Sequence, residues 1–96
     1  MLIGIRLLTL VFSLILGSHA QGATLLVANK SEASVSLFKL PGAELLATLP
    51  TGQGPHEVGV SPDGKRAIVT DYGTREGPGS TLTIIDVPGR AACFPL

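Results

Sequence analysis

The stretch Gly54-Pro-His-Glu-Val-Gly-Val-Ser-Pro-Asp-Gly-Lys-Arg-Ala-Ile-Val-Thr-Asp71 predicts two short strands joined by a tight turn. Val58 and Val60 alternate with other residues in the period-2 pattern of a strand that buries one face. The turn Ser61-Pro62-Asp63-Gly64 has proline at its first central position, and its glycine accepts the left-handed conformation that follows a type I hairpin turn. We therefore expect an antiparallel hairpin with Ala67–Thr70 as its second strand.

Two parts of this chain resemble earlier parts in the same order. Leu26-Val27-Ala28-Asn29 resembles Ile68-Val69-Thr70-Asp71 at an offset of 42 residues. The segment from Val35 to Gly42 resembles the segment from Leu82 to Gly89 at an offset of 47 residues. The difference of five residues falls in the segment before Thr81, where a solvated insertion costs little. This pattern predicts an internal duplication with the period of a propeller or another repeat array.

The other apolar runs after residue 20 are also short and end at proline, glycine or polar residues. We expect six strands, at residues 25–28, 35–40, 45–49, 57–61, 67–70 and 81–87, and a long glycine-rich loop at residues 71–80. The predicted fold class is therefore all-β, with about one and a half antiparallel propeller blades after an N-terminal signal helix.

The N-terminus has the pattern of a secretory signal peptide. Arg6 precedes an apolar run from Leu7 to Leu16, and Ser18-His19-Ala20 supplies small residues for cleavage. The run is shorter than the roughly 20 residues of a spanning helix, so we expect cleavage after Ala20, with Ala23 as the alternative site and a retained anchor as the alternative fate. The expected domains are a signal peptide (1–20), partial propeller repeats (21–90) and an atypical tail (91–96), in a periplasmic or secreted protein without a stable membrane span.

The charge and the cysteine content of the chain exclude some partners and some ways of stabilising the fold. Seven basic and seven acidic residues leave no basic stripe for a phosphate backbone, so nucleic acid is not an expected partner. Cys93 is the one cysteine, so no disulfide can form within a chain. A small exported chain without disulfides needs a compact core of its own, a partner or a missing remainder.

These segments resemble the YVTN-type β-propeller repeat proteins, a group of exported seven-bladed propellers. The resemblance is strongest in the Gly54–Asp71 stretch and in its neighbours Leu45–Gly52 and Leu82–Val87. It implies that the first three expected strands are the second, third and outermost strands of one blade, and that the next three are the first three strands of the following blade. The tail Ala91-Ala-Cys-Phe-Pro-Leu96 departs from the pattern, because it offers small residues and a proline where an outer strand is expected.

Two interpretations of the length of the chain follow. The chain is the N-terminal fragment of a propeller, or a short protein whose two-blade pieces assemble into a ring. In both cases residues 21–96 alone should self-associate through open sheet edges or fold poorly.

His56 is the one weak candidate for a binding site, because a loop that enters an innermost strand lies near the channel of a propeller. It could ligate haem or a metal, or it could only pack the turn at Gly54-Pro55. Asp71, Tyr72 and Glu57 are expected in structural hydrogen bonds or solvent, Asp63 in its turn, and the Cys93 thiol has no predicted role. No catalytic or metal site and no cofactor are expected, and His56 is the one weak candidate for cofactor binding, so the predicted function is a non-catalytic binding or scaffold protein of unknown ligand. The alternative is a fragment of a propeller enzyme or of a haem-carrying redox protein with His56 near the channel.

Overall fold

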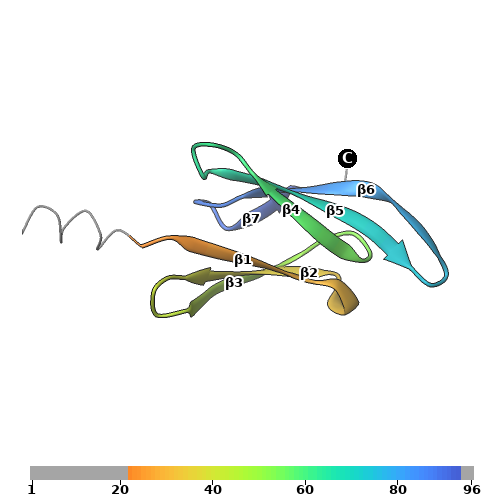
Figure 1. Cartoon of the computed structure of the whole chain (residues 1–96), viewed down its shortest axis with the longest axis horizontal. Coiled ribbons are helices and arrows are strands. Elements are labelled where there is room, and N and C mark those ends of the chain that lie inside the picture. The colour runs from red at the N-terminus through yellow and green to blue at the C-terminus, as the bar shows by residue number, and fades with distance from the viewer. Residues whose placement is uncertain (1–21, 94–96) are drawn as a thin grey trace, which may run out of the picture.

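The computed structural model describes residues 22–93 and consists of two antiparallel sheets that lie face to face (Figure 1). The strands of the first sheet are β1 (Thr24–Asn29), β2 (Ser34–Lys39) and β3 (Glu44–Pro50), with the 3-10 turn η1 (Lys30–Glu32) between β1 and β2. The strands of the second sheet are β4 (Pro55–Val60), β5 (Arg66–Thr74), β6 (Gly77–Asp86) and β7 (Ala91–Cys93). Each strand pairs with the next along the chain, so the predicted all-β antiparallel fold is confirmed.

The described residues hold no helix that is long and apolar enough to cross a membrane. The predicted signal helix, the predicted cleavage site after Ala20 and the last three residues of the tail lie outside the described residues. Ala23, the alternative cleavage site, lies just before β1.

The predicted loop at residues 71–80 was wrong, because β5 and β6 continue through it as a long hairpin. Figure 1 shows this hairpin extending beyond the other turns. Gly79 permits the close approach of its two strands, since a Cβ atom at Gly79 would overlap the backbone oxygen of Asp71. Glycines that resemble loop signals in the sequence are therefore places where two backbones meet.

The tail also differs from its prediction. Ala91–Cys93 forms a seventh strand, in which Ala91 pairs with Asp86 and Ala92 pairs with Ile85. Backbone hydrogen bonds hold this strand on β6, and they do not need the β-branched side chains whose absence suggested an irregular tail. The second sheet is therefore a complete four-stranded meander.

The hairpin between β4 and β5 has the predicted turn. Asp63 Oδ1 accepts hydrogen bonds from Ser61 Oγ at 2.6 Å and from the Lys65 backbone N–H at 3.0 Å. These bonds, the one from Ser61 first, hold the pKa of Asp63 below its usual value. Gly64 has the expected left-handed backbone, with φ at +72°.

The register of the two sheets repeats, which supports the internal duplication. In the first sheet Leu26 pairs with Leu37, and Asn29 pairs with Ser34. Moving β1 by 42 residues and β2 by 47 residues gives pairs that β5 and β6 also make, Ile68 with Ile84 and Asp71 with Thr81. The turns after β2 and β6 match as well: Pro-Gly is followed by Ala43 at φ +58° in one and by Arg90 at φ +50° in the other.

The hydrophobic core lies between the two sheets. Its fully buried members come from the facing surfaces of β2, β5 and β6 and are Val35, Leu37, Ala67, Val69 and Ile85. Strand β1 contacts β4 and strand β3 contacts β7, so the strands of the two sheets lie in corresponding order. The sheets therefore stack as two successive blades, each with one face in the core and one face away from it.

Candidate functional site

Three connections gather at one end of the stacked sheets, which we call the loop end: the linker Thr51–Gly54 between β3 and β4, the η1 turn and the tip of the β5–β6 hairpin. The Thr51 backbone N–H donates to Ala33 O at 2.9 Å, and the Tyr72 N–H donates to Gly54 O at 2.8 Å. Gly54 has φ at +69°, and a Cβ atom there would overlap Gly73 O. Only glycine lets the linker lie this close to β5, and the linker then directs the chain into β4.

His56, the predicted candidate, lies at the loop end on the first residues of β4. Its imidazole stacks on the Tyr72 ring, with the ring centroids 4.5 Å apart and the planes at 10°. Tyr72 Oη donates to Glu57 Oε1 at 2.9 Å, and His56 Nδ1 lies 3.9 Å from the same oxygen. The carboxylate that accepts the phenol hydrogen raises the pKa of Tyr72. The aromatic stack orients the His56 imidazole, while its side chain remains about half exposed.

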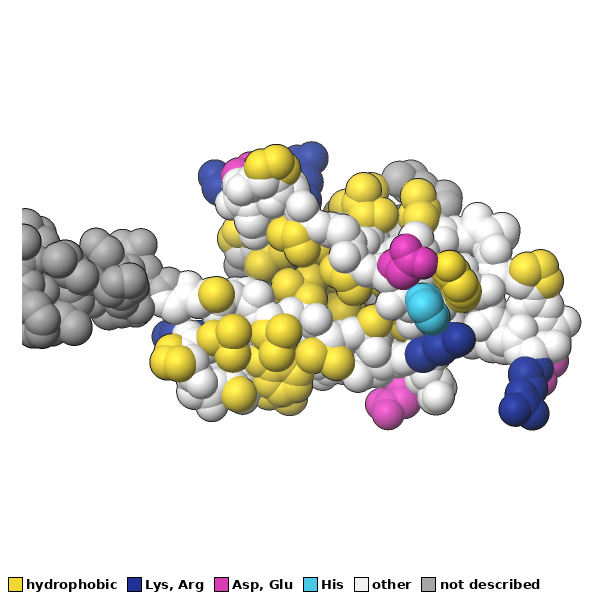
Figure 2. Space-filling model, viewed as in Figure 1, with side chains coloured by type: hydrophobic (Ala, Val, Ile, Leu, Met, Phe, Trp, Pro, Cys, Tyr) yellow, Lys and Arg dark blue, Asp and Glu magenta, His cyan; other side chains and the backbone are white. Residues whose placement is uncertain are grey.

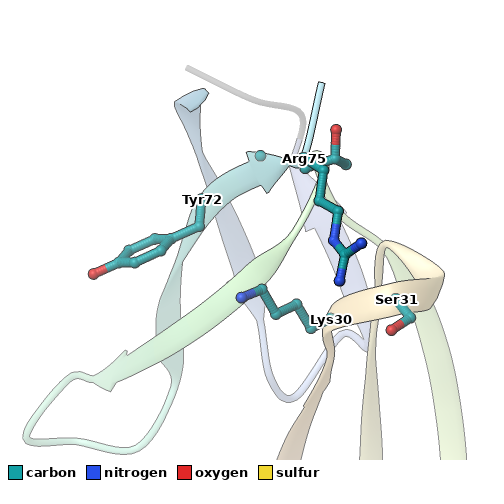
Figure 3. Close-up of a pocket in the computed structure, with 6 residues that line it drawn as sticks. Lys30, Ser31, Tyr72 and Arg75 are labelled. Atoms are coloured by element: carbon teal, nitrogen blue, oxygen red, sulfur yellow. The ribbon is translucent and has the colours of Figure 1, made fainter. Parts of the chain in front are cut away.

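A hollow of about 470 Å³ opens beside this stack, between the η1 turn and the β5–β6 hairpin. Figure 3 shows Lys30 of the η1 turn and Arg75 at the tip of the β5–β6 hairpin extending into the space between them. Ser31, Tyr72, Gly73 and Thr74 complete the lining. Glu76, the acidic residue next to Arg75, accepts a hydrogen bond from Thr74 Oγ1, and this bond lowers the pKa of Glu76.

Neither cation has an ionic partner within residues 22–93, where His56 Nδ1 is the one Lys, Arg or His nitrogen within 4.0 Å of a carboxylate oxygen. A hollow of the same volume lies at the opposite end of the second sheet, lined by Lys65 and Arg66, but Asp86 lines it too. The hollow at the loop end is therefore the more positive of the two, and it suits an anion. Sequence reasoning missed Lys30 and Arg75, because they come from different sheets and only the packing of the sheets brings them together.

Asp71 is buried just below the loop end and forms a polar cluster with β6. Its Oδ2 accepts hydrogen bonds from Thr81 Oγ1 at 2.8 Å and from Thr83 Oγ1 at 2.9 Å, and Thr83 Oγ1 also accepts from the Gly52 N–H at 3.2 Å. Asp71 is 4% exposed, and its Oδ1 has no hydrogen-bond partner among the described residues. The predicted structural role of Asp71 is confirmed, and we call Asp71, Thr81 and Thr83 the second triad.

The first sheet carries a matching cluster at the corresponding positions. Asn29 Nδ2 donates to Ser34 Oγ at 3.1 Å and to Ser36 Oγ at 2.9 Å, and we call these residues the first triad. Ser36 Oγ also lies 3.4 Å from Thr48 Oγ1 on β3. The offsets of 42 and 47 residues map each member of the first triad onto a member of the second, so the sequence repeat contained a signal for both.

Other groups with chemical potential do not converge on the loop end. Cys93 is exposed on β7, and Asp63 lies in the turn at the far end of β4. Within residues 22–93, no group of three or more His, Cys, Asp or Glu side chains could hold a metal ion. The arrangement at the loop end offers stacking, hydrogen bonding and positive charge, which are means of binding.

Two antiparallel meanders with one register, stacked face to face, define a β-propeller-like fold. Among solved structures the chain resembles hydrazine synthase of Kuenenia stuttgartiensis, a propeller-containing protein, with a TM-score of 0.68 and 26% identity. The match covers 76% of this chain and 20% of that chain, so this chain spans about a fifth of the structure that it matches. No protein-family model matches the sequence, and no curated protein matches it either.

Proposed function

We propose that this chain supplies blades to an exported β-propeller of the YVTN-repeat type and acts as a non-catalytic binding or scaffold protein. The family assignment is supported by the repeated register, the Ser61–Gly64 hairpin and the repeated Pro-Gly turns. A binding role is supported by the composition of the loop end, where an aromatic stack, hydroxyl groups and two cationic side chains gather around one hollow.

The hollow between Lys30 and Arg75 carries the proposal. Two cations line this hollow, its lining holds no carboxylate, and an anion bound between them would interact favourably with both. Arg75 can bind a carboxylate or phosphate group through two parallel hydrogen bonds, while Ser31 supplies a hydroxyl donor beside it. The ligand class that we propose is a small molecule with carboxylate or phosphate groups.

Tyrosine fluorescence tests this proposal directly, because Tyr72 is the one tyrosine of a chain without tryptophan, and it lines the hollow. We expect the emission of the mature chain to change saturably with inorganic phosphate or with citrate. Lys30→Ala and Arg75→Ala should each weaken this binding by about tenfold, the loss of one charge-assisted hydrogen bond. Citrate binding much tighter than phosphate binding would indicate a carboxylate ligand, and the reverse order a phosphate ligand.

Lys65→Ala and Arg66→Ala are the matched controls, since they remove the same charges from the hollow at the opposite end. They should leave both titrations unchanged. Equal losses in all four variants would mean only general attraction to a cationic surface, and they would contradict a site at the loop end.

Export is the second part of the proposal and has its own test. The protein recovered from the periplasm or the medium should begin at Gln21, which follows Ala20 in the sequence. An N-terminus at Thr24 would place cleavage after Ala23. An uncleaved chain in the cytoplasm would contradict export.

A second candidate function is a fragment of a propeller enzyme or of a haem-carrying redox protein, in which His56 contributes to the site. The likeness to part of an enzyme, hydrazine synthase, favours it. The stack on Tyr72 would hold the imidazole in place, and His56 Nε2 has no partner in residues 22–93. Titration of the mature chain with haem decides: a Soret shift that His56→Ala abolishes supports this candidate, and the absence of a shift removes it.

A further inference from the structure

Tyr72 holds an aromatic ring in water at the loop end, outside the hydrophobic core. Within residues 22–93 it is the one exposed Phe, Tyr or Trp side chain, at 52%, and it lines the hollow that Lys30 and Arg75 also line. Tyrosine is enriched at binding surfaces, because its ring is apolar and its hydroxyl is polar. The ring is therefore available as a contact for whatever occupies the hollow.

The Tyr72 ring is also held in place before any ligand arrives. Its hydroxyl donates to Glu57 Oε1, and the imidazole of His56 stacks on one of its faces. The ring remains half exposed in spite of this stack, so its second face is open. A side chain that is already fixed loses little conformational freedom on binding, which leaves more of the stacking energy for affinity.

The repeat brings a cation and the ring to the same space. The offset of 42 residues that relates β1 to β5 also relates Lys30 to Tyr72, and both residues line the hollow. Figure 3 shows their side chains, one from the η1 turn and one from β5, extending to the same side of the site. The two equivalent positions thus offer a ligand two different contacts, one for a negative charge and one for a flat apolar group.

Size and charge give such a ligand a direction. The hollow of about 470 Å³ lies within the range of roughly 300–1,000 Å³ that small-molecule sites have, so it has room for more than an inorganic anion. Glu57, at the hydroxyl of Tyr72, repels a negative charge, whereas Lys30 and Arg75 attract it. Figure 2 shows the histidine and basic side chains of the loop end on one face of the molecule, open to solvent.

We infer that the ligand of the loop end is an anion that carries a flat ring. The ring stacks on the open face of Tyr72, and the anionic group lies between Lys30 and Arg75. This inference rests on the proposed binding function and adds the ring to its ligand class. Mononucleotides and aromatic carboxylic acids share this chemistry. A ring stacked on an aromatic side chain strengthens binding by about tenfold.

Methyl phosphate and phenyl phosphate test the ring contact, because they carry the same anionic group and only the second has a ring. We expect the mature chain to bind phenyl phosphate about tenfold more tightly at about pH 8, where both esters are fully ionised. Phosphorus NMR of the two esters measures both affinities without using Tyr72 as the reporter. Arg75→Ala should weaken the binding of both esters and leave the ratio of their affinities unchanged.

Two substitutions of Tyr72 assign the preference to its ring. Tyr72→Leu keeps an apolar side chain without a ring, so the two affinities should become nearly equal while methyl phosphate binds as it does to the wild type. Tyr72→Phe is the matched control, because it removes only the hydroxyl that donates to Glu57, and it should retain the preference. Native β-sheet circular dichroism of both variants shows that they are folded.

The outcomes separate this inference from the proposed function. Equal binding of the two esters by the wild type, or a preference that Tyr72→Leu retains, would overturn the ring contact and leave the anion site in place. Binding of neither ester would overturn both. Where the preference holds, adenosine monophosphate compared with ribose phosphate, and benzoate compared with acetate, identify the source: the pair with the larger gain indicates a nucleotide or an aromatic carboxylic acid.

Discussion

The first and second triads occupy the same strand positions in two sheets and differ in what covers them. In the second sheet Thr83 receives the backbone N–H of Gly52 from the linker, and Asp71 is almost wholly buried. In the first sheet Asn29 is half-buried on the outward face, although both of its serine partners are still largely covered. The hydrogen bonds of a triad therefore come from the repeat itself, whereas the deeper burial of Asp71 than of Asn29 comes from the sheet that precedes it in the stack.

The same difference explains the side chains. An amide can meet water at no cost, so Asn29 is well suited to an outward face. Asp71 brings a carboxylate into the core, where one oxygen has two hydroxyl donors and the other has none among the described residues. Substitutions at the two triads should thus have unequal effects on the free energy of unfolding. The difference between them measures how much the burial of a triad, beyond its own hydrogen bonds, contributes to stability.

The largest effect should come from Gly52→Ala. Its new methyl group would lie 2.5 Å from Asp71 Oδ2 and 2.6 Å from Thr81 Oγ1, so the linker must move and lose its bond to Thr83. We expect a loss of about 3 kcal/mol in the free energy of unfolding, typical of an overpacked core. The measurement is guanidinium unfolding of the mature chain at one fixed protein concentration.

Gly42→Ala is the matched control for this variant, because a Cβ atom at Gly42 meets nothing within 4 Å. It lies in the turn of the first sheet, and its unfolding midpoint should stay within experimental error of the wild type. Equal losses in the two variants would mean that the contact with the second triad does not determine the effect.

A smaller difference should separate Asp71→Ala from Asn29→Ala. Removing Asp71 leaves the hydroxyls of Thr81 and Thr83 without their acceptor in a dry place, at a cost of about 2 kcal/mol. Removing Asn29 should cost about 1 kcal/mol or less, because water can replace it on the outward face. Denaturation under the same conditions gives both values, and equal losses would show that the first triad is as covered as the second.

Exchanging the amide and the carboxylate between the two triads should change the free energy of unfolding even less. Asp71→Asn keeps an oxygen for the two threonine hydroxyls and removes a buried charge, so we expect a change within about 1 kcal/mol in the stabilising direction at neutral pH. Asn29→Asp should be neutral within about 0.5 kcal/mol, since water reaches that position. A large loss in Asp71→Asn, close to that of Asp71→Ala, would contradict the absence of a partner for Oδ1 and would point to a bound cation.

The smallest expected effect on stability comes from the residues that directly follow Asn29 and Asp71 in the chain. Lys30 follows Asn29, whereas Tyr72 follows Asp71 and donates to Glu57. Tyrosinate absorbance, which reports Tyr72 alone in this chain, should therefore give a pKa above the usual value of about 10. The raised pKa means that the bond contributes to stability below the usual tyrosine pKa and is lost as the pH rises through the raised value.

Glu57→Gln should return the Tyr72 pKa toward its usual value, because it removes both the charged acceptor and its negative field. Both side chains are exposed at the loop end, so stability itself should change little. A Tyr72 pKa that does not respond to Glu57→Gln would show that the hydrogen bond is not formed in solution.

Much of the fold could be predicted because the alternation of apolar residues and the prolines and glycines that end strands act locally, and because the repeat can be read directly in the sequence. The centre of every predicted strand is a strand, and the Ser61–Gly64 turn follows from its own residues. The errors lie where a neighbouring backbone decides the structure. Gly79 permits a close strand pair and Ala91–Cys93 completes a sheet, although alone each segment resembles a loop.

The site could be predicted only in part. His56, Glu57, Asp71 and Tyr72 were all recognisable as polar or aromatic residues near a strand end, and the structure places them at or just below the loop end. The stack of His56 on Tyr72 could not be predicted, because a register shift between Pro55 and Val58 sets which side chains of β4 and β5 meet. The hollow at Lys30 and Arg75 depends on how the two sheets stack.

The matching turns after β2 and β6 have a consequence for what was copied in the duplication. In both turns a residue with a side chain, Ala43 or Arg90, holds the left-handed conformation directly after a Pro-Gly pair. Such a conformation costs roughly 1 kcal/mol in a residue other than glycine, and neither turn avoids this cost by placing its glycine one position later. Each turn joins the last two strands of its sheet, so the shared left-handed residue lies inside the repeated unit and was kept when that unit was copied, together with the strand register.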